Sequence, residues 1–70
     1  MITVEVFKTN VGEEVIAARL IRLLQLHYPN SKINFDLEDC DKILRVAEKD
    51  LAPEIIIATL NEQGYQCELL

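Results

Sequence analysis

The stretch from Phe35 to Asp41 holds the residue types best suited to chemistry in this 70-residue chain. It reads Phe-Asp-Leu-Glu-Asp-Cys-Asp, so the thiol of Cys40 lies between the carboxyl groups of Asp39 and Asp41. A thiolate with carboxylate neighbours suits zinc better than copper. The same residues also fit an exposed acidic turn whose charges discourage edge-to-edge pairing of a sheet. We favour the acidic turn and expect no metal, because no histidine is near and charged turns are common surface features.

Catalysis is not expected. Reactive cysteines lie in electropositive surroundings, whereas Cys40 is flanked by acidic residues. Cys67 alternates in phase with Tyr65 and Leu69, which indicates a small core residue. The single histidine, His27, has no catalytic partner in the sequence and fits the end of a helix. No Ser/His/Asp set, phosphate-binding loop or cofactor fingerprint occurs, so the sequence predicts a non-enzymatic protein without a cofactor.

Charge and composition argue against two classes of partner. Twelve acidic residues against seven basic ones give a formal net charge of −5. This charge repels a phosphate backbone unless the basic residues gather on one face, and here they are scattered. No apolar stretch approaches the ~20 residues that span a bilayer, and the N-terminal residues do not resemble a secretory signal. We therefore expect a cytoplasmic protein that binds neither nucleic acid nor membrane.

Hydrophobic periodicity predicts six elements. Alternation predicts strands over residues 2–7, 33–37, 42–47 and 65–69. A helix is expected between the capping box Asn10–Glu13 and Pro29, and a second between Pro53 and Gly64. Right-handed crossovers then give a ferredoxin-like βαββαβ sandwich of the α+β class. We expect residues 1–70 to form one domain, with a four-stranded antiparallel sheet and both helices on one face.

Alternation also predicts which strand residues face the core. The expected core residues are Ile2, Val4 and Val6 in the first strand and Leu44 and Val46 in the third. This leaves Phe7 and Ile43 as exposed apolar side chains, which a protein partner or a second copy of the chain can cover. The turn with Tyr65 is expected at the same end of the sandwich as the first loop and Cys40. Phe7, Ile43 and Tyr65 are therefore the predicted interaction residues.

Gly12 is followed by apolar residues after four, eight and eleven positions, at Ile16, Leu20 and Leu23, and Gln-Gly-Tyr occurs at 63–65. With these features the chain resembles the heavy-metal-associated domain family of small copper-chaperone-like modules over nearly its whole length. In that family the first loop reads Met-x-Cys-x-x-Cys, and the same apolar spacing follows the second cysteine. Phe7 stands at the methionine position. The resemblance implies the same βαββαβ fold.

The resemblance does not extend to the metal ligands. Thr9 and Gly12 stand at the two cysteine positions, or Asn10 and Glu13 if the alignment is shifted by one. Neither pair offers a thiolate, and copper(I) requires thiolate or thioether donors. We therefore expect a non-enzymatic interaction module that has lost its metal loop. Metal handling through the Cys40 hairpin is the alternative.

Overall fold

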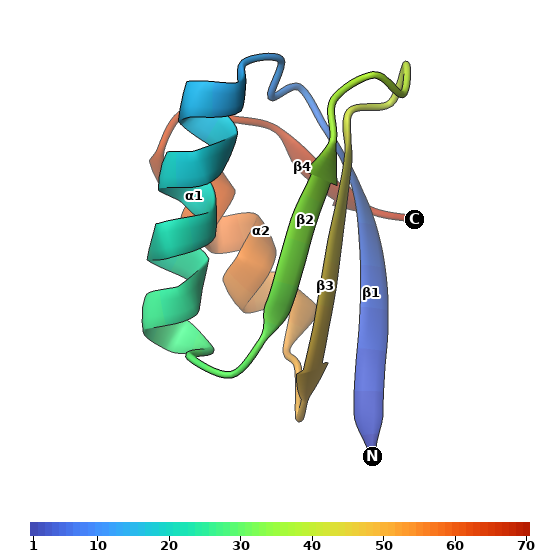
Figure 1. The fold of residues 1–70 in the computed structure, drawn as a ribbon, viewed down its shortest axis with the longest axis vertical. Helices are drawn as coiled ribbons and strands as arrows, with labels where there is room; N and C mark the ends of the chain where they lie inside the picture. Colours follow the sequence, from blue (N-terminus) through green and yellow to red (C-terminus); the bar gives the residue numbers. More distant parts are fainter.

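The computed structural model describes residues 1–70, which form a four-stranded antiparallel sheet with two helices on one face (Figure 1). The elements are β1 (Ile2–Thr9), α1 (Glu14–His27), β2 (Lys32–Asp36), β3 (Ile43–Lys49), α2 (Pro53–Glu62) and β4 (Cys67–Leu69). The strand order is β2-β3-β1-β4, so β2 and β4 are the edge strands. The predicted ferredoxin-like βαββαβ fold is confirmed. Neither helix has the length and apolar character needed to cross a membrane.

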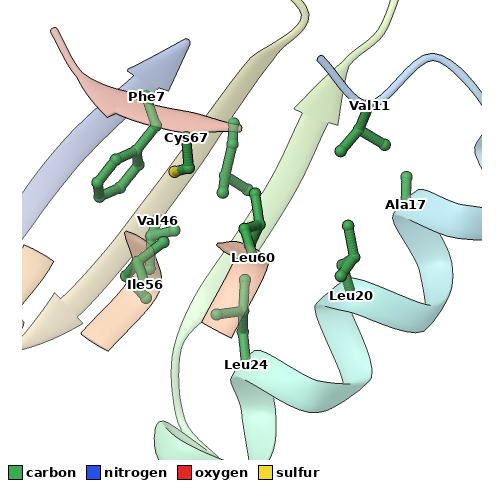
Figure 2. Close-up of a cluster of buried hydrophobic side chains, with 10 residues drawn as sticks. Phe7, Val11, Ala17, Leu20, Leu24, Val46, Ile56, Leu60 and Cys67 are labelled. Carbon is green, nitrogen blue, oxygen red and sulfur yellow. The ribbon is translucent and has the colours of Figure 1, made fainter. Parts of the chain in front are cut away.

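The core lies between the sheet and the two helices, with side chains from α1 pointing toward those of the strands (Figure 2). Its buried cluster consists of Phe7, Val11, Ala17, Leu20, Leu24, Leu44, Val46, Ile56, Leu60 and Cys67. After α2 the chain reverses at Gly64, whose φ is +92°. A residue without a Cβ adopts this left-handed conformation at little cost. The predicted role of Gly64 at the end of the second helix is confirmed.

The side of strand β1 that faces the core is not the predicted one. Phe7 is fully buried and Thr9 is 6% exposed, whereas Ile2 and Val4 are 70% and 59% exposed. Both phases of this strand carry apolar residues, so alternation alone does not decide its orientation. The phase that is buried places the phenyl ring of Phe7 in the core cluster, together with Val11 and Leu44. The predicted inward facing of Ile2, Val4 and Val6 and the predicted exposure of Phe7 were wrong.

Strand β3 faces the core as predicted but differs in one residue. Leu44 and Val46 are fully buried. Ile43 is out of phase with them and lies opposite Asp36 of β2. It is nevertheless only 6% exposed, so its predicted exposure was wrong. Alternation predicts the face toward which a side chain points, and it carries no information on whether that face is covered at a given position.

Helix α1 begins later than the capping box predicts. Its first residue is Glu14, and the N-cap residue Glu13 makes no side-chain capping bond. The Oδ1 atom of Asn10 instead accepts a hydrogen bond from the backbone N–H of Gln66 at 2.8 Å. The predicted capping role of Asn10 was therefore wrong. Its side chain ties the first loop to the residues that precede β4.

Candidate functional site

Hydrogen bonds join the first loop to the hairpin turn between β2 and β3. The backbone N–H of Thr9 donates to the carbonyl of Asp41 at 3.1 Å. The Oγ1 atom of Thr9 donates to the carbonyl of Lys42 at 2.6 Å and accepts from the N–H of Val11 at 3.2 Å. Together with the Asn10–Gln66 bond, these contacts gather the first loop, the Cys40 turn and the Tyr65 turn at one end, as expected from the topology.

Thr9 and Gly12, the two positions that the resemblance aligns with cysteines, lie in different environments. Thr9 is buried, and its hydroxyl is engaged both as a donor and as an acceptor. Gly12 is exposed, with open space where a Cβ atom would lie. The Thr9 side chain therefore links the loop to the hairpin, and both hydrogen bonds of its hydroxyl stabilise this part of the fold.

The three predicted interaction residues do not form an exposed apolar surface. Phe7 and Ile43 are buried, at 0% and 6% exposure. Tyr65 is half-buried and packs against the core cluster. Their apolar groups therefore stabilise the fold, and a contact surface must lie elsewhere.

The hairpin brings together the three residues of the alternative metal site. Asp39, Cys40 and Asp41 each offer one donor atom, and these atoms lie within 4.8 Å of one another. The Oδ1 atom of Asp39 accepts a hydrogen bond from the N–H of Asp41 at 2.9 Å. The Oδ1 atom of Asp41 lies 3.8 Å from the Nζ atom of Lys8. Asp39 thus has a partner in the turn and Asp41 has one in β1, and a zinc ion would compete with these partners for the two carboxylates.

The two cysteines are free thiols in different environments. Cys40 is exposed, and Cys67 lies in the core, as predicted. Burial raises the pKa of the Cys67 thiol from 9.0 to about 11, because desolvation disfavours the thiolate. The nucleophilic form of a cysteine is the thiolate, so Cys67 is inert near neutral pH. Its role is packing.

A groove between α1 and β2 is the feature that the sequence analysis missed. It has a volume of about 490 Å³, within the range of ligand sites in proteins. Its apolar lining is formed by Ala17, Ala18, Ile21, Ile33, Phe35 and Leu37. The small side chains of the two alanines leave space between the helix and the strand. Two adjacent alanines in an otherwise bulky helix are the sequence signal for this space.

All charged residues that line the groove are acidic. They are Glu14 at the start of α1, Asp36 at the end of β2 and Glu38 in the turn that follows. They lie toward the same end of the groove, where α1 begins and β2 ends (Figure 1). The groove therefore combines an apolar lining with a negative end, which favours an occupant with apolar side chains and a positive charge.

The backbone groups of the sheet alternate in direction, and two hydrogen bonds fix the phase. In β1, the N–H of Thr9 donates to Asp41 on the side of β3. The carbonyl of Val6 accepts from the N–H of Leu70 on the side of β4. Odd-numbered residues of β1 therefore bond to β3 and even-numbered residues point the other way. Through the strand register, the even-numbered residues of β3 bond to β1 and its odd-numbered residues bond to β2. In β2, the even-numbered residues therefore bond to β3 and the odd-numbered residues point outward.

The outer edge of β2 is open. Asn34 lies opposite Arg45 and directs its backbone groups toward β3. The backbone N–H and C=O groups of Ile33 and Phe35 consequently point away from β3, where no strand follows. Their side chains face the helix layer and pack against the core. An unpaired strand edge thus runs directly beside the apolar groove.

Comparison of the chain with models of protein families, with curated proteins and with solved structures finds no match. The groove and the open edge of β2 are therefore the basis of the functional proposal.

Proposed function

We propose that this chain is a non-enzymatic protein-interaction module that takes an extended protein segment as an additional strand on β2. The observation that supports this function is the free backbone of Ile33 and Phe35 beside the groove under α1. In strand addition, backbone hydrogen bonds provide affinity and pockets for alternate side chains provide specificity. On the strength of the resemblance, the scaffold is a heavy-metal-associated-type fold that has lost its metal loop.

The geometry of a strand defines what the segment must look like. Residues of the added strand that lie opposite Ile33 and Phe35 point toward the helix layer, as those two side chains do. They therefore enter the groove and must be apolar. The residue between them lies opposite Asn34 and points to the other face, where a polar side chain fits. The module is thus expected to select alternating apolar and polar residues in an extended segment.

The function can be tested by filling the groove. Ala18 is exposed and lines the groove, so Ala18→Trp blocks the space without disturbing the core. We expect this variant to bind peptides selected from a random library at least about tenfold more weakly than the parent, a loss of ~1.4 kcal/mol. The matched control is Ala58→Trp, which places the same side chain on an exposed position of α2. Fluorescence anisotropy with labelled peptides measures both affinities.

Amide hydrogen exchange supplies the second measurement for the same test. We expect peptide binding to slow the exchange of the Ile33 and Phe35 amides, which have no partner strand. The amide of Asn34 already bonds within the sheet and should change little. Failure to select any peptide, or binding that leaves the exchange of Ile33 and Phe35 unchanged, contradicts the proposed function.

Metal binding by the hairpin is the second candidate function, and the donor spacing within 4.8 Å favours it. Titration with zinc and copper(I) tests it in the parent, in Cys40→Ser and in the control Cys67→Ala. We expect weak zinc binding, because the turn has one thiol and its carboxylates already have partners. Tight binding of one zinc per chain in the parent and the control, lost in Cys40→Ser, would instead establish the hairpin as the functional site.

A further inference from the structure

We propose that the segment added to β2 is β2 of a second copy of this chain, which forms a two-fold dimer with one continuous sheet. This inference rests on the proposed function and names the partner at the same site. Strand β2 reads Lys32-Ile33-Asn34-Phe35-Asp36. Read in the opposite direction, the strand presents an acid, two apolar residues around a central asparagine, and a base. It is therefore complementary to itself in antiparallel pairing.

The backbone determines the register of this pairing. When Asn34 lies opposite Asn34 of the second copy, Ile33 lies opposite Phe35 of the second copy, and the reverse holds across the two-fold axis. These are the residues whose N–H and C=O groups point to the open edge. Each Ile33–Phe35 pair exchanges two backbone hydrogen bonds, so the two strands share four. A one-residue slip would turn the apolar side chains to the wrong face.

The charges favour the same register. Lys32 lies opposite Asp36 of the second copy, and Asp36 lies opposite Lys32 of the second copy. Opposite charges across paired strands stabilise the pairing, and like charges destabilise it. A shift of two residues in either direction would remove both contacts. Like Asn34, Lys32 and Asp36 are in the phase that points away from the helices, so these two charge contacts lie on the open face of the sheet.

The groove accommodates the remaining side chains. Ile33 and Phe35 of the second copy point toward the helix layer and enter the space beside Ala18 and Ile21. The two-fold symmetry fills the groove of the second copy in the same way. Because the paired strand has only five residues, the interface is small. We therefore expect a reversible dimer whose population depends on protein concentration.

A charge-swap experiment tests the pairing. Analytical ultracentrifugation should show self-association of the parent. Lys32→Asp and Asp36→Lys each place two like charges opposite each other, and each should weaken the dimer by about tenfold or more. An equimolar mixture of these two variants should associate again, because every mixed pair then joins opposite charges. The chain carrying both substitutions should also recover self-association.

The controls are Lys49→Asp and Glu54→Lys, which change charge at exposed positions outside β2 and should leave the dimer unchanged. A dimer that persists in both single variants, or a mixture that fails to associate, overturns the inference. A monomeric parent that still binds selected peptides at β2 overturns the inference and leaves the proposed function intact. A monomeric parent that binds no peptide contradicts both.

Discussion

Replacing Phe7 with alanine is expected to leave much of the protein unfolded at room temperature. The ring is fully buried in the core cluster, although strict alternation along the first strand assigns it to the surface. Truncating a buried phenylalanine to alanine costs roughly 3–5 kcal/mol. A small domain has a free energy of unfolding of only about 5 kcal/mol. Urea denaturation followed by circular dichroism measures the loss.

The matched control for Phe7→Ala is Val4→Ala in the same strand. Val4 is 59% exposed, so its truncation should change the free energy of unfolding by no more than about 0.5 kcal/mol. Together the two variants determine which face of β1 covers the core. A large loss for Val4→Ala with a small loss for Phe7→Ala would show that Ile2, Val4 and Val6 face inward after all.

The protein is expected to lose stability as the pH rises from about 9 to about 11 because of Cys67. Burial raises the pKa of its thiol from 9.0 to about 11. Between these values the thiol of the unfolded chain is ionised, whereas that of the folded chain is still protonated. The unfolded state then binds fewer protons, so the free energy of unfolding falls with rising pH. The full effect is at most about 2.7 kcal/mol and is absent below pH ~9.

A variant comparison isolates this contribution from those of other groups. Cys67→Ala has no thiol to ionise, so its free energy of unfolding should fall less steeply than that of the parent between pH ~9 and ~11. Its stability at neutral pH will be lower, because the substitution removes a buried sulfur atom, but the comparison concerns the slope. Urea denaturation at a series of pH values provides the measurement. Equal slopes in the parent and the variant would show that the thiol of Cys67 is not shielded from water.

The sequence specified the kind and order of the elements because these depend on local patterns. Leu44 and Val46 lie on either side of the charged Arg45, and both are buried as predicted. Gly64 adopts the left-handed conformation expected where the second helix ends. Given the six elements, the handedness of crossover connections leaves few topologies, so the ferredoxin-like fold followed.

Predictions from helix capping and strand alternation were wrong where residues distant in the sequence contact each other. Asn10 has the sequence context of a helix cap, but its side chain bonds Gln66, which is 56 residues away. Phe7 lies in a strand with apolar residues in both phases, and only packing against the helices shows which phase is buried. Ile43 points away from the core and is buried all the same. For Asn10 and Phe7, the deciding contact joins residues far apart in the chain.

The candidate site shows the same division between sequence and tertiary structure. The sequence by itself determined the order of the strands and helices and the charge pattern of Lys32-Ile33-Asn34-Phe35-Asp36. Only the tertiary structure decided that this strand lies at an edge, that the backbone of Ile33 and Phe35 is free and that Ala18 leaves a groove beside it. Strand periods and turns arise from interactions between near neighbours. Edges and grooves arise from the pairing of distant segments, which no local pattern records.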